Sequence, residues 1–285
     1  MPEIEKTKPE DFPAILPLLE EFDNASIKRS DWERIFAYDW SKDEPIVGFH
    51  LEDRGRVVGF LGGIFSKRLI NGQLENLCNL TSWIVREEFR NHSLALLLEM
   101  LKIQDHTFTN FSAAPSVSKV MLKLGFRELE SGFRIVPPSF RLFSFNRSRK
   151  ISIIGKIDYL RQRLKGDLRR ILDDHEGTSL RPLLIEEERG QCLAFYKIVK
   201  RRRNIRAAYF LSASNCSILN DQIDNVMKWI LLKHAVLFLI IDERFVETNR
   251  LKTAKSGRMP VSMLFKSDCL QPSDIDYLYS EIALL

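Results

Sequence analysis

The sequence has few cysteines, and the four it has lie far apart. Cys78, Cys192, Cys216 and Cys269 form no CxxC pair, which argues against a structural zinc site or a disulfide framework. No run of about 18 apolar residues occurs, so no membrane-spanning helix is expected. The charged N-terminal stretch MPEIEKTKPEDF lacks the apolar region of a secretory signal. These absences predict a cytoplasmic protein with reduced thiols.

Nucleotide-binding and hydrolase motifs are also missing. There is no GxGxxG and no βαβ repeat, which excludes a Rossmann-type reading. The five histidines show no ligand spacing, so no metal is expected, and no Ser-His-Asp order is present. The chain is 45% hydrophobic and 28% charged, which is typical of a globular protein, and its 285 residues suffice for one large domain or two ordinary ones.

Positive charge is concentrated in two stretches. Between residues 141 and 172 ten basic residues face two aspartates, a net charge of +8, and KRRRNIR at residues 200–206 carries +5. Such stretches attract phosphates or anionic lipid surfaces, but a solvated helix face and a hairpin turn have the same composition. The sequence leaves both readings open. Nucleic acid is not expected, because few aromatic residues accompany the first stretch.

The hydrophobic pattern of the first half predicts a defined order of elements. It predicts strands at residues 3–8, 47–52, 56–65, 75–85 and 106–112. It predicts helices starting near Pro9-Glu10-Asp11, at residues 31–38 capped by Ser30, after a loop at 86–92, and at 116–124. Asn71-Gly72 predicts a type I′ hairpin turn, and the glycines of the 56–65 strand predict bulges or close backbone approach.

Residues 76–102, NLCNLTSWIVREEFRNHSLALLLEMLK, are central to this half. They predict a buried strand, a polar loop and a very apolar helix. Leu94, Leu97, Leu98 and Leu101 have the i, i+3, i+4, i+7 spacing of a core-facing stripe. The loop meets the helix at its N-terminus, where unpaired N–H groups and the helix dipole favour an anion.

This stretch resembles the cofactor-binding segment of the GNAT acyltransferases, in which a central strand runs into a pyrophosphate loop and then a helix. The family loop is written (Q/R)xxGx(G/A), and Arg90, Ser93 and Ala95 of RNHSLA stand at the matching positions. A second family element, YxKLGF, stands here as MLKLGF from Met121 to Phe126. The resemblance covers about half of the chain. It implies an α/β (α+β) fold with a mixed, mostly antiparallel sheet flanked by helices.

The resemblance also implies acetyl-CoA or another acyl-CoA as co-substrate. Its expected binding residues are Ile84, Val85, Arg90, Asn91, His92, Ser93, Leu94 and Ala95. Ser93 replaces a glycine that lets backbone amides approach the pyrophosphate, and we expect its hydroxyl to cap the helix and contact phosphate. Asn91 tolerates the left-handed conformation that such a loop requires.

The implied chemistry is direct acyl transfer from a thioester to an amine. It needs a base for the amine, a strand amide that polarises the thioester and an acid for the thiolate. The usual acid is the Tyr of YxKLGF, and Met121 occupies that position here and is more typical of a core residue. The expected catalytic residues are Glu75, Asn79 acting through water, and Ser112. Glu75 equally suits a solvent-facing hairpin end.

The second half repeats the central order without sequence self-similarity. It predicts a helix at 154–172, strands at 180–186, 192–199, 206–211 and 236–241, a helix capped by Asn220, and a tail strand and helix that close this half. We expect a GNAT-like domain at 1–138, a basic helical connector at 139–175 and a second GNAT-like domain at 176–285.

The expected function is acyl-CoA-dependent N-acyl transfer, acetyl first, to a small-molecule amine. A phosphorylated or nucleotide-linked acceptor would suit the basic stretches, and resemblance to tandem chains suggests an amino sugar of surface-polysaccharide synthesis. The alternatives are a catalytically silent GNAT-like binding protein and a peripheral protein that contacts anionic membrane surfaces through the basic connector. An open groove between the 75–85 strand and its neighbour favours acyl-CoA, and a blocked one favours the silent protein.

Overall fold

The computed structural model describes residues 2–22, 27–40, 46–129, 132–138, 151–200, 205–247, 254–258 and 261–285. These residues form two compact units, each built on a seven-stranded sheet. Unit 1 comprises Met1–Leu129, Val261–Gln271 and Tyr279–Leu285, and unit 2 comprises Glu130–Pro260 and Pro272–Leu278.

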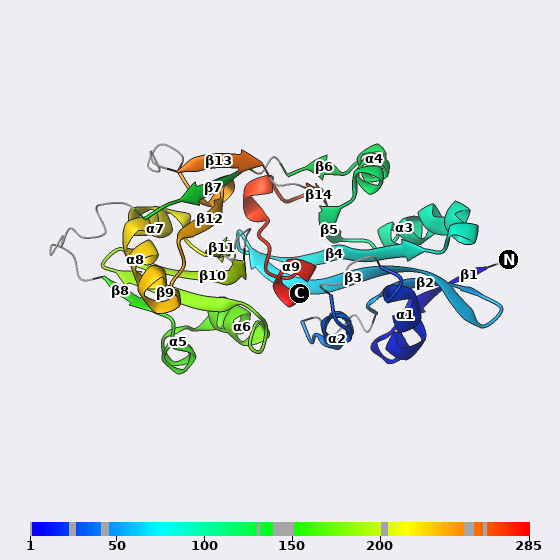
Figure 1. The fold of residues 1–285 in the computed structure, drawn as a ribbon, viewed down its shortest axis with the longest axis horizontal. Coiled ribbons are helices and arrows are strands. Elements are labelled where there is room, and N and C mark those ends of the chain that lie inside the picture. Colours follow the sequence, from blue (N-terminus) through cyan, green and yellow to red (C-terminus); the bar gives the residue numbers. More distant parts are fainter. Residues whose placement is uncertain are drawn as a thin grey trace. The chain divides into compact units, whose positions relative to one another are not determined.

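The sheet of unit 1 has the strand order β1-β2-β3-β4-β5-β14-β6 (Figure 1). Its strands are β1 (Glu3–Thr7), β2 (Gly48–Asp53), β3 (Arg56–Ile70), β4 (Gln73–Val85), β5 (His106–Ala113), β14 (Ser262–Lys266) and β6 (Arg127–Glu128). Only β4 and β5 are parallel among these neighbours. The predicted turn between β3 and β4 is confirmed, because Asn71 and Gly72 both have positive φ.

Helices cover both faces of this sheet (Figure 1). On one face α1 (Phe12–Leu19), which follows the 3₁₀ helix η1 (Pro9–Asp11), packs with α2 (Arg29–Ala37) and α9 (Glu281–Leu284) around a core containing Ile15 and Ile35. On the other face α3 (Ser93–Leu101) and α4 (Pro115–Lys123) pack around a second core. The predicted helices are therefore present, and the packing of their apolar stripes explains why these segments fold.

The start of α2 differs from the prediction. Ser30 lies inside the helix and is not its cap. The cap is Lys28, whose backbone N–H donates to Asp31 Oδ2 at 2.9 Å in a capping box. At the first helix Asp11 has the same role as Asp31, since its Oδ2 accepts from the Lys8 backbone N–H at 2.7 Å.

The predicted core stripe of α3 is half right. Leu97 is fully buried and Leu101 packs against the core, as predicted. Leu94 and Leu98 are 44% and 43% exposed, and Leu96 and Met100 are buried in their place. A Cβ on Gly63 of β3 would lie 3.1 Å from Met100 Cε, so this glycine lets α3 approach the sheet closely, as its presence in the strand predicted. Because α3 is apolar on nearly all sides, its periodicity could not choose the buried face.

Unit 2 repeats the central order of unit 1. Its sheet runs β13-β7-β12-β11-β10-β9-β8, with only β11 and β12 parallel. The strands are β7 (Gly132–Val136), β8 (Ser152–Ile154), β9 (Arg181–Glu187), β10 (Gly190–Lys200), β11 (Arg206–Ala213), β12 (Phe238–Asp242) and β13 (Lys255–Arg258). The helices are α5 (Ile157–Arg163), α6 (Gly166–Asp174), α7 (Cys216–Asp221) and α8 (Ile223–His234), with 3₁₀ helices η5 (Glu243–Phe245) and η7 (Pro272–Asp274).

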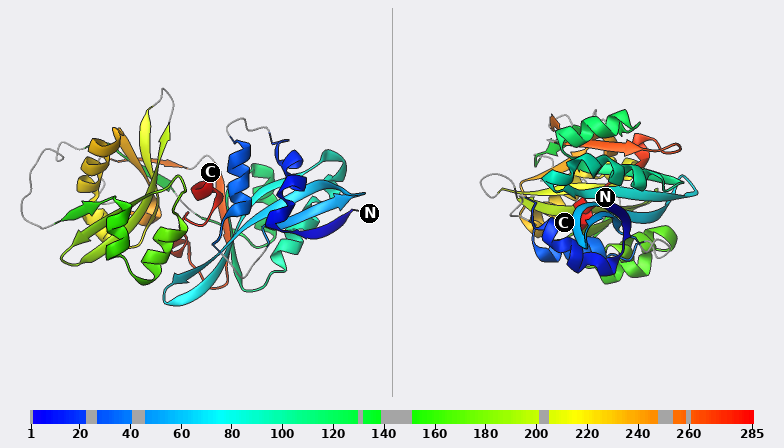
Figure 2. Two further views of the ribbon diagram at one scale, coloured as in Figure 1. Left: turned by 90° about the horizontal axis from the view of Figure 1, so that it is seen from below. Right: turned by 90° about the vertical axis from the view of Figure 1, so that its right-hand side faces the viewer.

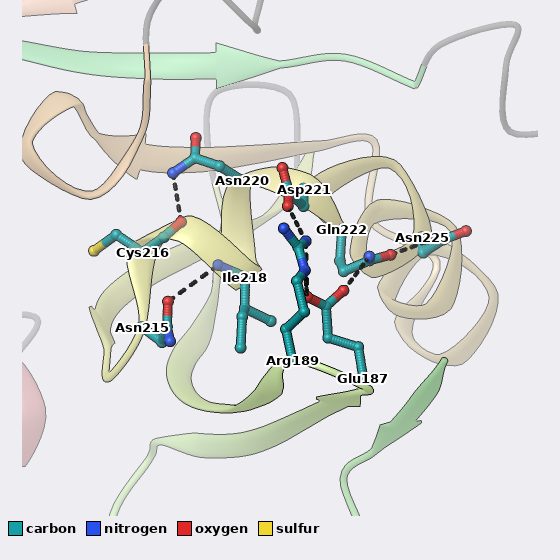
Figure 3. A network of polar contacts seen from close by, with 9 residues as sticks. All are labelled: Glu187, Arg189, Asn215, Cys216, Ile218, Asn220, Asp221, Gln222 and Asn225. Atoms are coloured by element: carbon teal, nitrogen blue, oxygen red, sulfur yellow. Dashed lines mark hydrogen bonds and ion pairs between the residues drawn. The ribbon is translucent and has the colours of Figure 1, made fainter. Parts of the chain in front are cut away.

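Two helices of unit 2 differ from the prediction. The segment at 154–172 contains α5 and α6, separated at Leu164 and Lys165, which are both extended. The helix expected to begin at Asn220 is α8, which has Gln222 at its N-cap. The preceding α7 was not predicted and is capped by Asn215, whose Oδ1 accepts from Ile218 N at 3.1 Å (Figure 3). Asn220 lies at the end of α7 and donates to the Phe245 carbonyl at 3.1 Å.

The tail does not close unit 2 as predicted. β14 pairs with β5 and β6 in the sheet of unit 1, and α9 also belongs to unit 1 (Figure 2). Strand pairing between segments so far apart in the chain has no local sequence signal. The other expected domain limits, at 138 and 175, stay a prediction, and residues 139–150 of the expected connector lie outside the described residues.

The α3 packing predicts a contrast between two neighbouring leucines. Leu97→Ala should lower the free energy of unfolding by about 2–5 kcal/mol, because it opens a cavity in a full core. Leu98→Ala, the matched control on the exposed side, should cost under about 1 kcal/mol. Urea unfolding of both variants measures this, and equal losses would contradict the observed helix face.

Candidate functional site

β4 carries a bulge near its C-terminal end. Ser82 and Trp83 are inserted between two β3–β4 pairs, so these two residues oppose only Leu61. Ser82 has a left-handed φ of 53°. Bulges bend a strand and re-aim its side chains, and this one redirects the last residues of β4. It lies opposite the Phe60–Gly62 step of β3, so the bulge predicted at the β3 glycines is confirmed here, with the extra residue on β4.

β4 and β5 part beyond the middle of β4. Their parallel pairing runs from Asn76–His106 to Asn79–Thr109, whereas β4 itself continues to Val85. Among the described residues β5 supplies no further pairing to β4. Backbone N–H and C=O groups need partners when buried, so the parted edge is a place where another chain or a ligand can bind.

A cavity of about 480 Å³ lies at this opening in unit 1. It is formed by the end of β4, the start of α3 and the first turns of α4, and we call it the unit 1 groove. Its lining residues are Trp83, Ile84, Val85, Arg90, Ser93, Leu94, Ser116, Val117 and Val120. The groove thus has mainly apolar walls with a guanidinium and two hydroxyls among them.

Five of the predicted cofactor residues line this groove: Ile84, Val85, Arg90, Ser93 and Leu94. Asn91, His92 and Ala95 are not part of the lining. Trp83 and the three residues from α4 line it without having been predicted. The α4 residues follow β5 directly, so the same parting of strands brings them to the groove.

The segment before α3 is not the open loop that was expected. Residues Glu87–His92 form a 3₁₀ helix, η2, that runs directly into α3. Asn91 has no left-handed φ, and Ser93 is the first helical residue, with no side-chain cap present. The Ser93 N–H donates to the Arg90 carbonyl. The Ser93 backbone N–H, which was expected to bind an anion, therefore already has a hydrogen-bond partner. The positive end of the α3 dipole still lies at this position.

Glu75 lies away from the unit 1 groove. It is ten residues before Val85 on β4, a separation of roughly 33 Å along a strand. It lines a different cavity of about 530 Å³, where Cys269 Sγ donates to Glu75 Oε2 at 3.1 Å. The structure thus does not bring Glu75 together with the other predicted residues.

Asn79 and Ser112 meet at a third residue, Glu281. Asn79 is buried where β4 and β5 part, donates through Nδ2 to Thr109 Oγ1 at 3.0 Å and accepts from Glu281 N at 3.2 Å. Ser112 Oγ donates to Glu281 Oε1 at 2.8 Å. This contact of Glu281 was not predicted, because Glu281 follows Ser112 by 169 residues.

The interpretation of Met121 as a core residue is confirmed. Its side chain is fully buried in the cluster beneath α3 and α4. Among the residues that the structure describes, no tyrosine lines the unit 1 groove. The position that carries the usual acid in YxKLGF therefore supplies no proton donor to it.

Solved structures share this arrangement over almost the whole chain. The GCN5-related N-acetyltransferases of Anabaena variabilis and Kribbella flavida are both 12% identical, with TM-scores of 0.60 and 0.61 over 93% of this chain and 72% and 70% of theirs. A tandem GNAT protein from the clavulanic acid biosynthesis pathway is 12% identical with a TM-score of 0.52, over 93% of this chain and 97% of that one. The fold is a tandem GNAT fold. Sequence comparison found no matching family profile and no matching curated protein.

In the second GNAT-like unit the chain itself occupies the corresponding opening. β11 and β12 pair from Ala207–Phe238 to Tyr209–Ile240 and then part. Past that point the Tyr277 N–H donates to the Leu211 carbonyl of β11 at 3.1 Å. Residues 272–278 thus provide a hydrogen-bond partner to the part of the β11 edge that does not pair with β12.

A buried polar network holds this segment in place. Asp242 accepts from the Tyr277 hydroxyl and pairs with Arg244 at 2.9 Å, and Asp242 and Tyr277 are almost fully buried. Burial raises the pKa of Tyr277 above its ordinary value, so its hydroxyl keeps the proton that it donates. Arg244 Nη1 donates to the carbonyls of Pro272 and Ile275 at 2.7 and 2.8 Å.

The basic helices of unit 2 neutralise much of their own charge. Arg169 pairs with Asp173 at 2.7 Å, Arg170 pairs with Asp167 at 2.6 Å, and Arg161 pairs with Glu176. This favours the reading of α5 and α6 as a solvated face. Residues 141–150 and 201–204 of the predicted basic stretches lie outside the described residues.

Other site types find little support in the described part of the chain. No group of three or more His, Cys, Asp or Glu side chains gathers as metal ligands there. No helix in that part is long and apolar enough to cross a membrane. Cys78 and Cys192 are buried thiols as expected, and Cys269 is exposed.

The network in unit 2 predicts a large effect of one substitution. Arg244→Met should destabilise unit 2 by about 3–5 kcal/mol, because it leaves the Asp242 carboxylate buried without its cation. Arg170→Met breaks an ion pair on the surface and should cost under about 1 kcal/mol. Urea unfolding of both variants is the measurement, and a loss for Arg244→Met no larger than that of the control would contradict the role of this network.

Proposed function

We propose that the protein is an acyl-CoA-dependent N-acyltransferase that binds acyl-CoA in the unit 1 groove. The observation that carries the proposal is that this groove is open where β4 and β5 part. An open groove is what distinguishes an acyl-CoA site from the remnant of one in a silent binding protein. The tandem GNAT fold supports the same reading, since N-acetyltransferases have it.

The lining suits the chemistry of an acyl-CoA. Ile84, Val85 and Val117 provide apolar walls for the acyl and pantetheine chain, and the parted edge of β4 offers backbone groups to its amides. Arg90 and Ser93 sit at the positive end of the α3 dipole, where phosphates are favoured. The Arg90 side chain is 71% exposed and free to swing toward a phosphate, since its contact with Glu87 is 3.9 Å long.

We assign one acyl-CoA to each chain, in unit 1. In unit 2 the Tyr277 N–H donates to the edge of β11. Arg244, which is paired with Asp242, donates to the Ile275 carbonyl and so holds residues 272–278 in place. A ligand there would have to displace the buried Tyr277, break its hydrogen bond to Asp242 and break the bonds from Arg244 to the carbonyls of Pro272 and Ile275. We therefore assign no acyl-CoA to unit 2.

Acetyl is the first acyl group to test, and an amine is the acceptor class. An amino sugar is the first acceptor to screen, a choice that rests on resemblance to tandem chains alone. The silent binding protein remains the second candidate, and the observation in its favour is the buried Met121 at the usual position of the acid.

Calorimetry with acetyl-CoA tests the proposal. We expect one site per chain, and we expect Ser93→Glu to weaken binding at least tenfold, because a carboxylate would face the phosphates at the start of α3. The fold should survive, since an acidic residue in a first helical turn is favourable.

Ser217→Glu is the matched control. It places the same side chain in the first turn of α7 in unit 2, and should leave acetyl-CoA binding unchanged. Absence of binding to acetyl-CoA and to longer acyl-CoAs would move the assignment to a silent protein. Two sites per chain would contradict the assignment of unit 2, and unchanged affinity in Ser93→Glu would contradict the position of the phosphates.

A further inference from the structure

A buried carboxylate lies where the two central strands of unit 1 part. Glu281 is the first residue of α9 and only 6% exposed. It belongs to a helix that packs on the α1–α2 face of the sheet, whereas the unit 1 groove is lined by α3 and α4 on the other face. The carboxylate is thus on the opposite side of the opening from the unit 1 groove, where we propose that the thioester binds.

The contacts of Glu281 tie it to both parted strands. Its backbone N–H donates to Asn79 Oδ1 of β4 at 3.2 Å, and its Oε1 accepts from Ser112 Oγ of β5 at 2.8 Å. Asn79 lies at the last β4–β5 pair, and Ser112 is three residues beyond it on β5. The carboxylate is therefore fixed at the point where the opening begins.

In this contact the Ser112 hydroxyl is the donor and the Glu281 carboxylate is the acceptor. Ser112 differs from Glu281 in being exposed. A hydroxyl that is open on one side and bonded to a buried carboxylate on the other is suited to accept a proton from solvent or substrate and pass its own inward.

We propose that Ser112 and Glu281 form a proton relay for the acceptor amine, Ser112 touching the amine and Glu281 holding the proton. This rests on the proposed N-acyltransferase function. The ammonium donates to Ser112 Oγ as Ser112 gives its proton to Glu281 Oε1. The amine lone pair then attacks the thioester carbon, forming the C–N bond.

The remaining steps balance the reaction. The C–S bond breaks and its electron pair leaves with sulfur as a thiolate. The thiolate takes the second nitrogen proton, giving the amide and free CoA thiol, and the proton on Glu281 returns to solvent. Two guanidinium groups on neighbouring elements contact this segment: Arg34 Nη1 of α2 donates to the Leu284 carbonyl, and Arg68 of β3 lies over the Tyr279 ring.

The test compares Glu281→Gln and Ser112→Ala with wild type, using acetyl-CoA and a panel of amino sugars, polyamines and ethanolamine. Thiol release and product mass report transfer, and calorimetry reports acetyl-CoA binding separately. We expect both variants to bind acetyl-CoA within twofold of wild type and to lose transfer by about 100-fold or more at pH 7. Exposed Glu128→Gln is the matched control and should keep the wild-type rate.

A pH profile separates a relay from a structural role. Without the relay only amine that is already neutral in solution reacts, so the rate of Glu281→Gln should rise about tenfold per pH unit below the pKa of the amine. Loss of transfer by the same factor at every pH, or a wild-type rate in either variant, would overturn the relay. So would a wild type that binds acetyl-CoA yet acylates none of these amines. Absence of acetyl-CoA binding by the wild type would instead overturn the proposed function itself.

Discussion

The parting of β4 from β5 is the constraint on which the rest of unit 1 depends. β4 pairs with β3 over its whole length but with β5 over only four residues, so most of one edge needs other partners. Unit 2 has the same opening between β11 and β12 and satisfies it with its own Tyr277. One topology thus yields an open groove in one unit and an occupied edge in the other, and the proposed position of acyl-CoA rests on this difference.

Local patterns predicted most of the strands and few of the details that shape the site. The Asn71-Gly72 turn and the buried strands follow from short-range chemistry, which a sequence displays directly. The face of α3 does not, because Leu94 and Leu98 are as apolar as the buried Leu97, and the choice is made by how closely the helix can approach β3 at its glycines. The return of β14 to unit 1 depends on pairing with β5, a segment more than a hundred residues earlier.

The residues of the candidate site also divide into those that short-range patterns predict and those that only the tertiary structure brings together. Ile84, Val85 and Ser93 were found because the strand, turn and helix that carry them are contiguous in the chain. Glu75 lies on the same strand as these residues, yet an extended chain carries it far from them. Glu281 was missed because its contacts to Asn79 and Ser112 are made only when the tail folds onto unit 1. Residues that meet through the tertiary structure leave no spacing in the sequence to read.

A crystal structure of the protein grown with CoA would show which of the two units holds the ligand. We expect CoA between β4 and β5 of unit 1, with its phosphates near Ser93, while residues 272–278 keep their place beside β11 in unit 2. CoA beside β11, with Tyr277 displaced, would contradict the proposed position. So would a unit 1 groove that closes under conditions in which CoA is bound elsewhere.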